Sequence, residues 1–217
     1  MCNTVLIENA HLFVKSRPNL SGIDYGEQDY LRSIRSSIHA LWDGSIDVFT
    51  FIDSMVSAID RSFHRAWYEG IAEYGFKPDE MTPEEVTRLG EEINGQIPYI
   101  VPFAQAIQRS TKALGGKIAP FYFRAEMWGN RYGAVKSIAR QSVAGDGKIL
   151  WQWNPLKEHC PDCARLNGRV YRASTWRKYN IEPRSRLLAC EGYKCGCTFV
   201  PTTERCTPGR PPNIAGI

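Results

Sequence analysis

The chain lacks the sequence patterns of the common catalytic and membrane-spanning proteins. None of its apolar stretches approaches the roughly 18 consecutive residues that a spanning helix needs, because charge, glycine or proline interrupts each one. It has no glycine-rich phosphate loop, no His-Glu-x-x-His and no Gly-x-Ser-x-Gly motif. We therefore predict a protein that is not an enzyme and that has no membrane partner.

The first residues also show no basic stretch followed by a long apolar one, so we do not expect a secretory signal. We expect the chain to stay in a reducing cytoplasm, where cysteines serve as metal ligands or redox groups more often than as disulfides. What the chain does have is seven cysteines. Five of them gather in the last third, as Cys160-x-x-Cys163 and Cys190-x4-Cys195-x-Cys197.

This spacing predicts a structural zinc ion. Two cysteines two residues apart can bind one ion from a single tight turn, and a second cluster can complete a tetrahedron at Zn–S distances near 2.3 Å. Cys197 and His159 are reserve ligands, because Cys195 and Cys197 would point to opposite faces of an extended segment. The predicted ligands are Cys160, Cys163, Cys190 and Cys195.

Other interpretations of the cysteines stay open. They could be buried without a ligand, or be crosslinked. A thioredoxin-like redox pair would need a strand before Cys160 and a helix after it, whereas Trp151 to Pro155 lead into a turn. Cys2 and Cys206 have no partner at ligand spacing, and we assign neither a role.

Basic charge is concentrated in the cysteine-rich part. Residues 1–150 carry 16 Lys and Arg against 18 Asp and Glu, and residues 151–217 carry 11 against 5. Such a module could contact nucleic acid by neutralising phosphates, or could be a solvated surface. The candidate phosphate contacts are Arg165, Arg169, Arg172, Arg177 and Lys178.

The remainder of the chain predicts a mainly α fold. Apolar residues at steps of three and four indicate long helices over 49–74, 86–104 and 128–143 and a shorter one over 28–42. Thr82 and Glu85 form a capping box, and Pro98 and Pro102 should kink or split the second long helix near 95–102. The glycines in Gly145-Asp146-Gly147 mark a boundary.

Four parts follow from this pattern. An extended N-terminal arm covers 1–27, and a helical body with long antiparallel helices covers 28–147. A small α+β module of the zinc-knuckle kind covers 148–206, and an extended tail covers 207–217.

The phrase from His159 to Tyr171, with the closing Cys195-Gly-Cys-Thr-Phe-Val-Pro201, resembles the C-terminal module of the phage head morphogenesis family, the Mu F-like minor head proteins of tailed bacteriophages. The resemblance covers about 120–201. It departs from the family pattern at Gly192, where the family commonly has His, and Cys190 would then supply the replacement ligand.

The resemblance implies a minor structural protein of a phage head, made in the bacterial host cytoplasm and found in the virion. It would associate with the portal or the inner capsid surface and act in head assembly or in DNA packaging and delivery. Its partners would be the portal protein, the major capsid protein, or both, and packaged DNA could be a further one. The competing hypothesis is a zinc-dependent nucleic-acid-binding protein.

Overall fold

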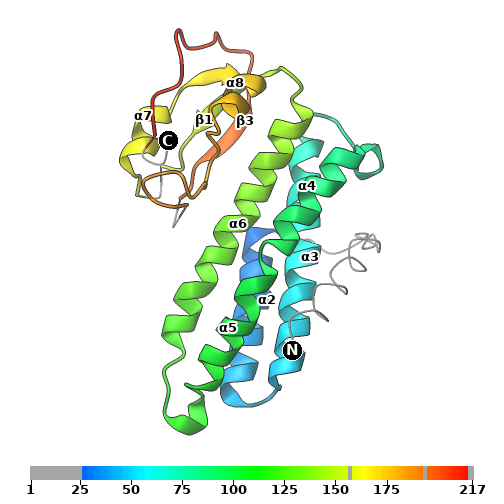
Figure 1. The fold of residues 1–217 in the computed structure, drawn as a ribbon, viewed down its shortest axis with the longest axis vertical. Coiled ribbons are helices and arrows are strands. Elements are labelled where there is room, and N and C mark those ends of the chain that lie inside the picture. The colour runs from blue at the N-terminus through cyan, green and yellow to red at the C-terminus, as the bar shows by residue number, and fades with distance from the viewer. Residues whose placement is uncertain (1–25, 156–157, 193–194, 215–217) are drawn as a thin grey trace. The chain divides into compact units, whose positions relative to one another are not determined.

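The computed structural model describes residues 26–155, 158–192 and 195–214, so the predicted arm lies almost wholly outside the described residues. The predicted mainly helical class is confirmed, with a small antiparallel sheet near the C-terminus. The elements in chain order are α2 (Glu27–Asp43), α3 (Val48–Ala72), η1 (Pro78–Glu80), α4 (Pro83–Asn94), α5 (Ile97–Gln108), η2 (Lys112–Leu114), α6 (Ala119–Val143), β1 (Lys148–Gln152), α7 (Pro161–Leu166), β2 (Val170–Arg172), α8 (Ala173–Lys178) and β3 (Thr198–Pro201) (Figure 1).

The chain divides into two compact units, which are not successive in the sequence. The first unit comprises the described residues of Met1–Arg65 together with Val86–Ala125, and the second comprises those of Ala66–Glu85 and Glu126–Ile217. The division runs through α3 and α6, so each of these helices has one part in the first unit and one part in the second. The predicted boundary at 147 therefore falls inside the second unit.

The first unit is a set of helices around an apolar core. The stripe of α2 is buried as predicted, and Gly44 ends this helix in the left-handed conformation. Phe51 of α3 and Phe103 of α5 pack with their ring centroids 6.1 Å apart. The predicted split is also present, since α4 ends at Asn94 and α5 begins at Ile97. None of the described helices has the length and apolarity needed to cross a bilayer.

Two residues of the predicted apolar stripes are exposed. Phe49 is 79% exposed and Val86 is 42% exposed, so their assignment to the core was wrong. The buried stripe of α3 begins at Phe51 and continues through Met55 and Ile59. Phe49 precedes this stripe by two residues, which turns it about 200° around the helix and away from the core.

The sheet of the second unit has the order β2-β1-β3, with both pairs antiparallel. Along β1 the burial alternates, and Ile149 and Trp151 face the core. The indole N–H of Trp176 in α8 donates to the carbonyl of Ile149 at 3.1 Å, which fixes α8 against the strand. The ring of Phe199 in β3 packs edge-on against Trp151, with centroids 5.6 Å apart.

The C-terminal part of α6 joins the sheet to the end of α3. Gly70 of α3 lies so close to Ala139 that a Cβ on this glycine would be 2.7 Å from the Ala139 Cβ. The predicted capping box is confirmed, with Thr82 N 2.9 Å from Glu85 Oε2 and Glu85 N 3.2 Å from Thr82 Oγ1. Glu85 also accepts a hydrogen bond from Ser142 of α6 at 2.7 Å.

Arg140 of α6 is the central polar residue of this packing. Its guanidinium binds both carboxylate oxygens of Glu73, with Nε–Oε2 at 2.6 Å and Nη2–Oε1 at 2.5 Å. Nη1 also donates to the hydroxyl of Thr198 and, at 2.7 Å, to the carbonyl of Phe199. One buried arginine therefore connects the end of α3 with β3, the strand that directly follows the last clustered cysteine.

We expect Glu73→Gln to remove a pH-dependent part of the stability. Burial raises the pKa of Glu73, but the hydrogen bond and charge of Arg140 outweigh this and hold the pKa below its ordinary value of 4.5. The carboxylate therefore stabilises the fold above about pH 4.5, and this contribution is lost as the pH falls through the lowered pKa.

Urea unfolding from neutral pH to about pH 3 measures the effect. The difference in free energy of unfolding between the native chain and Glu73→Gln should shrink with acidity. The control is Glu204→Gln, at an exposed carboxylate. A difference that does not change with pH would contradict this role of Glu73.

Candidate metal centre

Cys160 and Cys163 lie at the start of α7. Cys160 is the N-cap residue, with extended backbone angles, and Pro161 occupies the first helical turn. The Cys160 sulfur accepts a hydrogen bond from the Cys163 backbone amide at 3.4 Å. This turn brings the two Sγ atoms to 3.3 Å from each other.

The other three clustered cysteines, Cys190, Cys195 and Cys197, lie between α8 and β3. Glu191 and Gly192 both have left-handed backbone angles, with φ of 50° and 74°, and reverse the chain after Cys190. The chain then places Cys195 and Cys197 beside α7, with the Sγ atoms of Cys163 and Cys195 3.8 Å apart. The turn and the start of β3 thus position the second group of sulfurs.

Five sulfurs form two overlapping triads that share Cys163. Within each triad all sulfurs lie within 4.8 Å of one another. One triad is Cys160, Cys163 and Cys190, and the other is Cys163, Cys195 and Cys197. Cys163, Cys195 and Cys197 are buried, whereas Cys160 and Cys190 are partly exposed. This arrangement can hold a metal ion, for which thiolate sulfurs are strong ligands.

The electrostatics of the cluster favour a bound cation. Hydrogen bonds from Cys163 and the other neighbouring thiols hold the pKa of Cys195 far below its ordinary value. A contact with Cys163 favours the Cys197 thiolate, but the hydrogen bond with Cys195 and burial raise the pKa of Cys197 to about 12. The negative sulfur of Cys195 therefore disfavours the thiolates of Cys163, Cys190 and Cys197, and a bound divalent ion would favour them.

The expectation that Cys195 and Cys197 point to opposite faces is wrong, because both sulfurs belong to one triad. The reason is that side chains alternate with a period of two, so residues i and i+2 of an extended segment lie on the same face and not on opposite ones. Of the other candidates, His159 stacks on Trp153 with centroids 4.2 Å apart. His159 and Cys206 are in neither triad of the described residues, and Cys2 lies outside that part of the chain.

Asp162 fixes the cysteine segments relative to each other, a role that the spacing of the cysteines did not predict. Its carboxylate is fully buried and forms an ion pair with Arg165. Oδ2 accepts a hydrogen bond from the backbone amide of Ala189 at 2.8 Å. The residue between Cys160 and Cys163 therefore holds the backbone directly before Cys190. Contacts of this kind orient metal ligands.

Arg184 connects the turn at Gly192 with α6. Its Nη1 donates to the carbonyl of Asn130 at 3.0 Å, and its guanidinium occupies the space that a side chain at Gly133 would need. The carbonyl oxygen of Arg184 lies only 2.2 Å from the position that a Cβ on Gly192 would occupy. A histidine at position 192, as the resembled family commonly has, is therefore incompatible with this turn.

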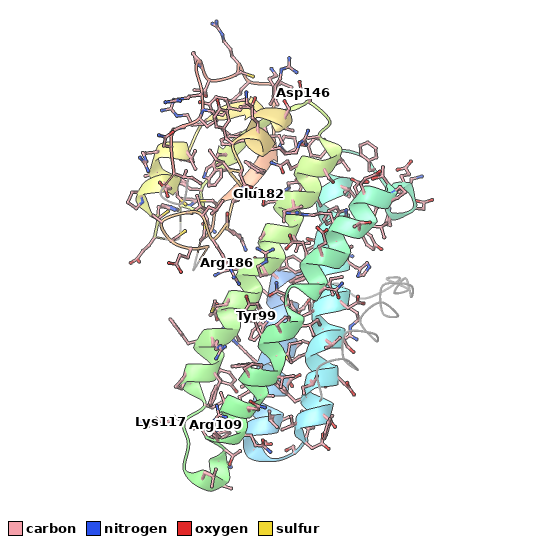
Figure 2. All side chains as sticks on the ribbon, in the orientation of Figure 1. Tyr99, Arg109, Lys117, Asp146, Glu182 and Arg186 are labelled. Atoms are coloured by element: carbon pink, nitrogen blue, oxygen red, sulfur yellow. The ribbon has the colours of Figure 1, made fainter. Side chains whose placement is uncertain are left out.

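The five candidate phosphate-binding residues all have contacts within the chain. Arg165 pairs with Asp162, and Arg172 with Asp146, which Figure 2 shows at the turn between α6 and β1. Arg177 donates to the carbonyls of Gln141 and Gly145 at the end of α6. The others are Arg169, whose Nε lies 3.4 Å from the Arg165 carbonyl, and Lys178, whose Nζ lies 5.8 Å from the Tyr179 ring centroid. Several of these basic groups thus have a role in the fold.

An apolar core supports the sulfur cluster. Trp151, Trp176 and Phe199 are essentially fully buried and pack with the buried cysteines. The described part of the predicted extended tail, residues 207–214, has no helix or strand. Ile214 is nevertheless buried in this core, and Thr207 N donates to the Val170 carbonyl at 2.8 Å. The cysteine module therefore has an apolar core of its own beside the sulfurs.

Comparison of the chain with models of protein families, with curated proteins and with solved structures found no match in any of the three.

We expect Gly192→Ala to destabilise the second unit more than Gly168→Ala. Both glycines have left-handed angles, with φ of 74° and 76°, so alanine at either position costs about 1–2 kcal/mol. A Cβ at Gly168 meets nothing within 4 Å, whereas one at Gly192 would overlap the Arg184 carbonyl. Such a clash adds about 1–3 kcal/mol. If urea unfolding shows that both variants lose the same free energy of unfolding, the turn at Gly192 is not packed as described.

Proposed function

We propose that the cysteine cluster holds one structural zinc ion. The ligands are Cys160, Cys163, Cys190 and Cys195, with Cys197 in reserve. The observation that carries this proposal is the convergence of five sulfurs from two separate chain segments in two overlapping, partly buried triads that share Cys163. Zinc suits a tetrahedron of thiolates and needs no open position when its role is structural.

We propose further that the protein is a minor structural component of a tailed-phage head. It would associate with the portal or the inner capsid surface during head assembly or DNA packaging and delivery. The resemblance of 159–171 and 195–201 to the head morphogenesis family supports this role. A metal-stabilised module with arginines engaged in packing is also what a structural, non-catalytic subunit needs.

The alternative is a zinc-dependent nucleic-acid-binding protein. The same basic residues would then have to bind phosphates, although Arg165 and Arg172 pair with carboxylates and Arg177 caps α6. Breaking these contacts costs free energy, which reduces the net binding free energy from each phosphate contact. We therefore favour the structural role.

Elemental analysis of the purified protein tests the metal proposal. We expect about one zinc ion per chain, and its loss in Cys163→Ser, because Cys163 belongs to both sulfur triads. Cys206→Ser is the matched control, since this cysteine lies outside both triads, and it should retain the zinc. A native chain without metal, or a Cys163→Ser variant that keeps the full content, would refute the proposal.

Mass spectrometry of purified particles of the encoding phage tests the head assignment. We expect the chain in the particles, at a lower copy number than the major capsid protein, and its absence would contradict the assignment. Binding to duplex DNA, measured as a function of salt, tests the alternative. Each phosphate contact changes the slope of log K against log salt by about 0.9, so a slope that becomes shallower by about 1.8 on neutralising Arg169 and Lys178 would favour the nucleic-acid role.

A further inference from the structure

We propose that Cys160 and Cys163 form a peroxide-sensitive pair whose oxidation to a disulfide releases the metal ion. The inference concerns the regulation of the proposed zinc site and rests on that proposal for the release of the ion. The formation of the disulfide itself depends only on the geometry of α7.

Distance selects this pair. The two sulfurs are 3.3 Å apart, closer than the sulfurs of Cys163 and Cys195, which are 3.8 Å apart. A disulfide is about 2.05 Å long, so an approach of about 1.3 Å suffices. Both residues lie on one turn with two residues between them, so the pair can close without moving another segment.

Accessibility selects Cys160 as the sulfur that reacts first. Cys160 is partly exposed, whereas Cys163 is 1% exposed. Cys190 is partly exposed as well, but its segment is held by the Ala189 hydrogen bond to Asp162 and would have to move toward a partner.

The chemistry needs only hydrogen peroxide. The Cys160 thiolate attacks one peroxide oxygen, the O–O bond breaks, and hydroxide leaves, which gives a sulfenic acid. The Cys163 sulfur then attacks the Cys160 sulfur and displaces its oxygen, which leaves as water after taking up a proton. Two sulfurs are oxidised by two electrons in total and the peroxide is reduced. Three clustered cysteines remain, too few for a closed four-sulfur site.

Trypsin separates the cysteines into distinct peptides, which makes the test direct. Cys160 and Cys163 fall in Glu158–Arg165, Cys190 in Leu187–Lys194, and Cys195 and Cys197 in Cys195–Arg205. Cys206 falls in a fourth peptide. A disulfide within Glu158–Arg165 lowers the mass of that peptide by two hydrogens, and any other pairing changes or links different peptides.

The experiment adds stoichiometric peroxide to the zinc-loaded protein in the presence of a chromogenic zinc chelator, followed by alkylation and digestion. We expect zinc release in step with the Cys160–Cys163 disulfide, and recovery of zinc binding after reduction. Cys206→Ser should behave like the native chain. Cys160→Ser, if it still binds zinc, should form no disulfide in Glu158–Arg165.

The outcomes separate the two proposals. A chain without zinc that still forms the disulfide refutes the zinc site and leaves the reactive pair. A zinc-loaded chain in which another cysteine pair oxidises first, or in which the ion stays bound after the disulfide has formed, refutes the inference. Dependence of the release on Cys206 would also refute it.

Discussion

The crowding of five sulfurs around Cys163 is the constraint on which the second unit depends. Neighbouring thiols stabilise one thiolate, at Cys195, but several adjacent thiolates would repel one another in a partly buried site. A divalent cation bound by these thiolates would neutralise their charge and so remove the repulsion. The sulfurs come from the start of α7 and from the segment before β3, so a bound ion would join parts of the chain that are about thirty residues apart.

Two arginines connect these cysteine segments with α6. Arg140 binds Thr198 and Phe199, which directly follow Cys197, and its other partner is Glu73 at the end of α3. Arg184 places its guanidinium against Gly133 and its carbonyl against Gly192. The ligand segments are therefore held in place by packing as well as by any ion. The aromatic core formed by Trp151, Trp176 and Phe199 also helps to hold these segments in place.

The sequence was sufficient for most of α2 to α6 and for the cysteine cluster, because each depends on local spacing, whereas the short helices α7 and α8 were not predicted. The capping box at Thr82 and the break between α4 and α5 follow from single residues and their neighbours. The roles of Asp162 and Arg184 could not be predicted, since both depend on segments that meet only in the folded chain. The exposure of Phe49 was missed because steps of three and four residues can be drawn on more than one face of α3, and the face that is buried begins at Phe51.

X-ray absorption spectroscopy at the zinc edge tests the central claim most directly. The metal-loaded protein should show about four sulfur neighbours at about 2.3 Å and no lighter ligand. A shell that contains nitrogen or oxygen at about 2.0–2.1 Å would contradict a site built from the clustered cysteines alone.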